Sequence, residues 1–131
     1  MSSHRYTASL RILSRTVRLA EMIACLGQPS SSHDIGDPVS PGRPDSPRHV
    51  HSRWVLDSTE QEPSLEAQLE YLLAFAEVHR ECLAELVQHG ECIDVACGIF
   101  TADDAQGGFT LDVAVMRRLV ELGLDAWFDI Y

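Results

Sequence analysis

The clearest structural signal in this chain of 131 residues is the segment 124–131, LDAWFDIY. Apolar side chains occupy its even-numbered positions, which are Leu124, Ala126, Phe128 and Ile130. Because successive side chains of a β-strand point to opposite faces, this alternation predicts a strand whose even row packs on a core. The other row, Asp125, Trp127, Asp129 and Tyr131, then points away from that core.

Three other segments follow the same rule and predict strands over 6–13, 53–57 and 91–100. The segment 91–100 has one row of Ile93, Val95, Cys97 and Ile99 and a second row of Cys92, Asp94, Ala96 and Gly98. In the first strand, Arg11 belongs to the row opposite Leu10 and Ile12. Trp54 is assigned to neither face.

Helical spacing of apolar residues predicts helices over 17–26, 64–89 and 111–122. Ser14 and Thr110 are the expected N-caps of the first and third helices. The long second helix either runs unbroken to His89 or bends near His79, and Gly90 ends it. A turn-rich loop is expected over 101–108.

The order of these elements predicts an α+β fold, a two-layer sandwich in which about three helices cover one face of a mainly antiparallel sheet. We expect a variant of the ferredoxin-like fold. A chain of this length forms one domain, residues 1–131. Residues 28–51 hold five of the six prolines and few apolar residues, which predicts a long inserted loop. Such a loop is either functional or disordered, and disorder is the preferred interpretation.

The formal net charge is −10, with ten Arg and no Lys. A surface with this much negative charge repels phosphate backbones and anionic lipids. Neither a nucleic acid nor a membrane is therefore an expected partner. The Arg residues near the N-terminus are interpreted as ordinary solvated or paired charges. No apolar run is long enough for a transmembrane helix, and no signal peptide is recognised, so a cytoplasmic location is expected.

The four cysteines form no Cys-x-x-Cys pair. Cys92 and Cys97 are five positions apart in a predicted strand, so their side chains point to opposite faces. Free, mostly buried thiols are therefore expected, rather than a disulfide or a zinc site.

Several landmarks occur in a characteristic order along the chain. They are CLGQP at 25–29, Gly36-Asp37, WVLDS at 54–58, GFTL at 108–111, LVELG at 119–123 and FDIY at 128–131. With the alternating first strand and the leucine-rich helix, they make the chain resemble the bacterial family called domain of unknown function 4279. The resemblance covers nearly the whole chain. It implies no reaction and supplies no catalytic residues.

No sequence motif of a catalytic nucleophile, a metalloprotease or a phosphate-binding loop is present. His49 and His51 could meet on one face of an extended segment, but solvated loop histidines are the preferred interpretation. Neither a metal nor a cofactor is expected, and a binding protein is the preferred interpretation over an enzyme.

The predicted sheet face turned away from the helices carries large aromatic side chains beside charges. Such a combination is typical of recognition surfaces. The candidate interface consists of Arg11, Asp94, Asp125, Trp127, Asp129 and Tyr131. The competing interpretation is an ordinary solvated face.

Two functions follow as hypotheses. The first is a small interaction module, of an immunity or regulatory type, that binds a basic protein or a second copy of itself. The alternative is a small enzyme or small-molecule binder with a pocket between the loop 28–51 and the sheet, lined by His49, His51, Arg53 and Asp57.

Overall fold

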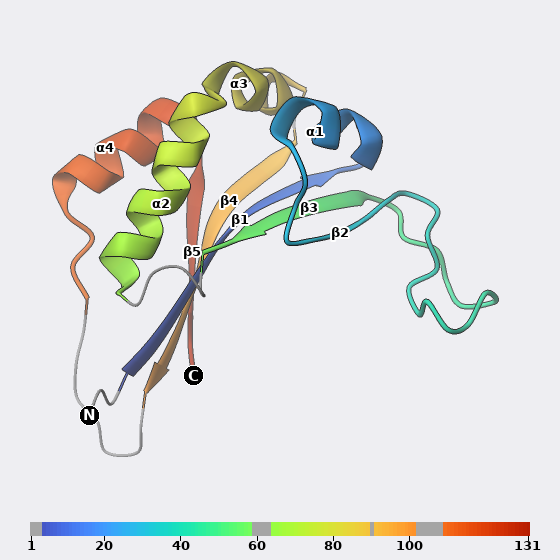
Figure 1. Ribbon diagram of the computed structural model, residues 1–131, viewed down its shortest axis with the longest axis horizontal. Helices are drawn as coiled ribbons and strands as arrows, with labels where there is room; N and C mark the ends of the chain where they lie inside the picture. Colours follow the sequence, from blue (N-terminus) through green and yellow to red (C-terminus); the bar gives the residue numbers. More distant parts are fainter. Residues whose placement is uncertain (1–3, 59–63, 90, 102–108) are drawn as a thin grey trace.

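The computed structural model describes residues 4–58, 64–89, 91–101 and 109–131. Within these residues, four helices lie on one side of a five-stranded sheet (Figure 1). In chain order the elements are β1 His4–Ser14, α1 Leu19–Leu26, β2 Ser31–His33, β3 Ser52–Asp57, α2 Leu65–Val78, α3 Arg80–Gln88, β4 Cys92–Thr101, α4 Val113–Leu122 and β5 Asp125–Ile130. The expected two-layer α+β class is confirmed. The loop residues 102–108 and Gly90 fall outside the described part of the chain.

The strand order across the sheet is β2-β3-β1-β4-β5. β1 pairs with both β3 and β4 in antiparallel orientation, and β2 pairs with β3 in the same way. β5 alone pairs in parallel, with β4. A parallel neighbour requires a crossover connection, and α4 provides it. The sheet is therefore mixed, and mainly antiparallel as the sequence predicts.

The core lies between this sheet and the helices. Leu10 and Ile12 from β1 and Val95 from β4 are fully or almost fully buried there, as are Leu72 and Leu73 from α2. Full burial of one such side chain contributes roughly 1.5–3 kcal/mol to folding. The sequence therefore predicts correctly which row of side chains in β1 and β4 faces the core.

The predicted inward row of β5 is correct only in part. Leu124 is buried and Phe128 packs against the core, but Ala126 is exposed and Ile130 is 69% exposed. β5 is the last strand of the sheet, and α4 covers only part of its helix side. Alternation therefore assigns the face of a side chain, whereas the neighbouring elements decide its burial.

The long helix breaks at His79, whose backbone leaves the helical region at φ −104° and ψ 24°. Its ring nitrogen Nδ1 lies 2.9 Å from the Phe75 carbonyl oxygen, and its ring stacks on the Phe75 ring at 4.2 Å. The helix begins as the sequence indicates, because the Ser64 side chain accepts the Ala67 N–H. The break explains why four helices are present instead of about three.

Two expected N-caps are wrong. The Ser14 hydroxyl accepts the N–H groups of the turn after β1, and α1 starts only at Leu19. The Leu19 N–H is instead accepted by the Asp34 carboxylate, 3.1 Å away and fifteen residues further along the chain. α4 is capped by Asp112 rather than Thr110. Asp34 could not be recognised from local sequence because tertiary structure brings it to the helix.

The segment 28–51 is ordered, contrary to the expectation. It contributes β2 and then a hairpin-like extension, the arm, formed by residues 34–50, which projects away from the body (Figure 1). Backbone hydrogen bonds join its two sides, from the Gly36 N–H to the His49 oxygen and from the Val39 N–H to the Pro47 oxygen. Prolines lack the N–H donor but keep the carbonyl acceptor, so a Pro-rich hairpin can still be hydrogen-bonded.

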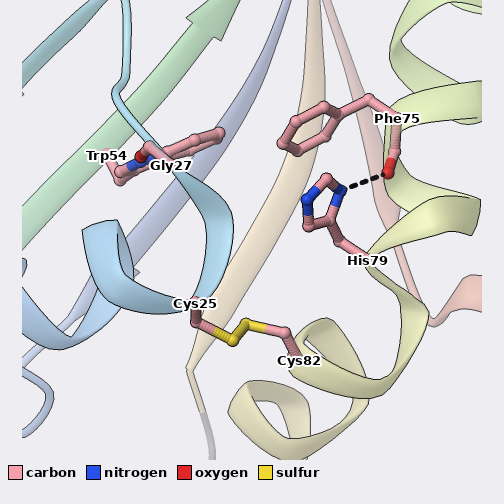
Figure 2. Close-up of a disulfide and its surroundings, with 6 residues drawn as sticks. All are labelled: Cys25, Gly27, Trp54, Phe75, His79 and Cys82. Carbon is pink, nitrogen blue, oxygen red and sulfur yellow. Dashed lines mark hydrogen bonds between the residues drawn. A yellow bond between two sulfur atoms is a disulfide. The ribbon is translucent and has the colours of Figure 1, made fainter.

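A disulfide joins Cys25 at the end of α1 to Cys82 in α3, which corrects the expectation of free thiols at these positions (Figure 2). Beside it, the Trp54 indole N–H donates to the Gly27 carbonyl oxygen at 2.9 Å, and its ring stacks on Phe75 at 5.8 Å. Trp54 is therefore a core residue, fully buried on the helix side of the sheet.

Cys92 and Cys97 are unpaired and lie on opposite faces, as the sequence predicts. Cys92 is exposed, whereas Cys97 is buried in the core. Burial raises the pKa of the Cys97 thiol to about 12. Cys97 is therefore a protonated core side chain rather than a nucleophile.

Candidate functional site

The candidate site is the open face, the side of the sheet turned away from the four helices. Strand pairing places Arg11 beside Asp94, and Asp94 beside Asp125. The next rows on the same face pair Ala96 with Trp127 and Gly98 with Asp129. The structure therefore brings all six residues of the predicted interface onto one face, although they come from three different strands.

The centre of the open face is an ion pair covered by an indole ring. Arg11 donates from Nε and Nη2 to the two carboxylate oxygens of Asp94, at 2.8 and 2.7 Å. The same guanidinium lies 5.0 Å from the centroid of the Trp127 ring. Hydrogen bonding to Asp94 raises the pKa of Arg11, so this group stays charged. Bidentate hydrogen bonding of this kind fixes the position of the guanidinium. The Trp127 ring is held in turn by its cation–π contact with that guanidinium.

A second aromatic contact lies further along the same face. The rings of Phe100 and Tyr131 stack with centroids 4.5 Å apart and an angle of 4° between their planes. The Arg5 guanidinium lies 5.7 Å from the centroid of the Phe100 ring. Phe100 is absent from the interface expected from the sequence, but it continues the row of Asp94, Ala96 and Gly98 by one step. Extending that row would have found it.

Two acids of the face differ in their surroundings. A hydrogen bond from the Tyr131 hydroxyl to the Asp129 carboxylate raises the pKa of Tyr131. Asp125 is exposed, and among the described residues no side chain pairs with its carboxylate. Trp127 and Tyr131 are 49% and 64% exposed. The face therefore presents aromatic surface and acidic groups to solvent together.

A shallow hollow of about 220 Å³ runs across the open face. Its lining includes Arg11, Trp127 and Tyr131, and on the far side Arg53 and Asp57 from β3. Pockets that enclose drug-sized ligands are usually larger and more closed. The hollow is therefore too small to enclose a drug-sized ligand.

The four residues expected around one small-molecule pocket do not come together. Arg53 and Asp57 line the hollow of the open face. His51 lines a different cavity of about 420 Å³ at the end of β1, which also contains Cys92 and His89. His49 stacks on His33 in β2, with ring centroids 3.5 Å apart.

His33, His49 and His51 form a cluster at the base of the arm. The His33 ring lies 5.5 Å from that of His51, measured between centroids. Burial lowers the pKa of His33, and the neighbouring His49, His51 and Arg53 lower it further, against a smaller opposite effect of Asp37. Within residues 4–58, 64–89, 91–101 and 109–131, no three His, Cys, Asp or Glu side chains are placed to hold a metal ion.

Two of the four arginines near the N-terminus are paired with acids. Arg11 pairs with Asp94, and Arg18 pairs with Asp34 at 2.8 Å. Hydrogen bonding to Arg18 holds the pKa of Asp34 far below its usual range. None of the described helices has both the length and the apolar character needed to cross a bilayer.

Fold and surface together define a small α+β sandwich with one helix-covered and one open sheet face. The chain belongs to the family described as "Domain of unknown function (DUF4279)", whose model matches residues 4–131. This confirms the resemblance drawn from the sequence landmarks. No curated protein and no solved structure matches the chain.

Proposed function

We propose that the protein is a non-catalytic interaction module whose open face binds a basic surface of a partner protein. The observation that carries the proposal is Trp127, which is half exposed and yet held in place by Arg11 and Asp94. A large aromatic side chain with few rotatable bonds loses little entropy when it is covered, and Trp is enriched among residues that dominate binding energy.

Charge supports a basic partner over a second copy of the chain. The chain carries a net charge of −10, so two copies repel each other while a basic protein is attracted from a distance. On the face itself, Asp125 has no paired side chain within the described part of the chain and offers its carboxylate to an incoming cation. A bacterial immunity-type or regulatory protein that covers a basic partner has these properties.

The proposal includes a cytoplasmic location. The redox state of the Cys25–Cys82 pair in the cell tests this part of the proposal. Disulfides persist in oxidising compartments and are rare in reducing ones. Alkylation of free thiols in intact cells, followed by mass spectrometry, measures the state of this pair. A fully oxidised pair in the cell would contradict a reducing cytoplasm as the site of action.

A photo-crosslinking experiment tests the binding surface. Tyr131 is replaced by p-benzoylphenylalanine, and in a matched control the exposed Val120 on the outer side of α4 is replaced in the same way. We expect one basic protein to be crosslinked from Tyr131 and not from Val120, and the purified partner to bind the wild-type chain more weakly as salt increases. The same adducts at both positions, or a crosslinked dimer of the chain itself, would contradict the proposal.

A further inference from the structure

The outer edge of β5 is the place where the sheet can accept another strand. β5 is the last strand in the order β2-β3-β1-β4-β5, and its one partner within the described residues is β4. At the opposite end, β2 is only three residues long and continues into the arm. β5 is twice as long and, among the residues that the structure describes, presents the larger unpaired edge.

The parallel pairing shows which backbone groups face outward. The Tyr131 N–H donates to the Ile99 carbonyl oxygen at 2.9 Å, so odd-numbered residues of this segment direct their backbone groups toward β4. The N–H and C=O groups of Ala126, Phe128 and Ile130 therefore point away from the sheet. Free groups in this alternation are the template to which an extended peptide adds.

The side chains along this edge are suited to one kind of occupant. Ala126 and Ile130 are exposed on the helix side, and Asp125, Trp127 and Asp129 lie on the open face. Opposite charges on directly paired residues of neighbouring strands stabilise the pair, and like charges destabilise it. A second copy of β5 would bring its own two acids to this edge, whereas a basic strand would bring cations.

We infer that the partner contributes an extended basic segment that pairs with β5 as a sixth strand, with Arg or Lys side chains beside Asp125 and Asp129. This inference rests on the proposed function and specifies how the partner binds. Backbone pairing along Ala126, Phe128 and Ile130 provides the attachment. Trp127 then packs on the aliphatic part of an incoming basic side chain.

The test uses a synthetic hexapeptide of alternating Arg and Val, blocked at both ends, and the same peptide N-methylated at its Val residues. In an antiparallel pairing that places Arg beside Asp125 and Asp129, the Val N–H groups face β5. N-methylation keeps every side chain and charge but removes the N–H groups of one edge. On the protein, Ala126→Pro removes one outward N–H at an edge position where Pro is tolerated, and Ala126→Val is the matched control that keeps it.

We expect the unmodified peptide to slow amide exchange at Ala126, Phe128 and Ile130. Its affinity should fall at least about tenfold with N-methylation, which removes several N–H donors, and about fivefold with Ala126→Pro, which removes one. Ala126→Val keeps the outward N–H and should bind the peptide more tightly than Ala126→Pro does, whereas Val120→Ala, on the outer side of α4, should leave the affinity unchanged. If Ala126→Pro does not fold, amide exchange in the wild-type chain still shows whether the peptide pairs with the edge of β5.

Absent binding, unchanged amide exchange, or equal affinity for the N-methylated peptide would overturn the inference. Peptide binding that is lost in Trp127→Ala without any protection of the edge amides would overturn strand addition and leave the proposed open-face binding intact.

Discussion

Removing the disulfide should destabilise the fold by a calculable amount. Cys25 and Cys82 are separated by 57 positions. In the chain-entropy description, a crosslink that closes a loop of this length stabilises the folded state by about 4 kcal/mol, because it restricts the unfolded chain. Cys82→Ser removes the crosslink and leaves a side chain of nearly the same size.

Equilibrium unfolding in urea, followed by tryptophan fluorescence, measures this effect. With a slope of about 2 kcal/mol per molar urea, the midpoint should fall by about 2 M in Cys82→Ser. The folded state should remain, because α1 also docks through the buried Met22 and Leu26. The control is Cys92→Ser, which changes an exposed, unpaired cysteine and should leave the midpoint unchanged. Equal midpoints for Cys82→Ser and the oxidised wild-type chain would refute the reasoning, as would four free thiols in the purified protein.

Two further predictions concern charged groups. Arg11→Ala should lower the free energy of unfolding by about 1–2 kcal/mol, because it leaves the half-buried Asp94 without its hydrogen bonds. Thermal unfolding measures this loss. An equal loss in the control Arg15→Ala, which changes an exposed arginine, would contradict the prediction. Acidification should also destabilise the protein, because the folded-state pKa of His33 lies below its ordinary value near 6.5. The contribution of neutral His33 to the free energy of unfolding is fully present above about pH 6.5. It is lost as the pH falls through the folded-state pKa. Thermal midpoints measured from pH 7.5 to 5 should fall less steeply in His33→Gln than in the control His89→Gln, and identical slopes would refute the assignment.

The faces of the strands could be predicted because their signal is local. Alternation in β1 and β4 placed Leu10 and Val95 inward and Arg11 and Asp94 outward, and the strand pairing confirms it. The candidate interface follows from the same rule. Burial was less predictable, as Ile130 shows, because it depends on which helix covers the strand.

Features that depend on distant contacts could not be predicted. The sequence names four cysteines, but only the docking of α1 beside α3 selects Cys25 and Cys82 as the bonded pair. Asp34 caps α1 from the arm, across fifteen residues. The composition of the arm predicted disorder, and this prediction is wrong. Backbone hydrogen bonds to carbonyl acceptors and the stacked rings of His33 and His49 order this Pro-rich segment.

The central claim is that the open face, and Trp127 in particular, forms the binding surface. The affinity of the photo-crosslinked partner for two matched variants tests it most directly. We predict that Trp127→Ala weakens binding by about 30-fold, corresponding to about 2 kcal/mol for a central interface tryptophan, and that Val120→Ala leaves binding unchanged. Equal affinities for the two variants would contradict the claim.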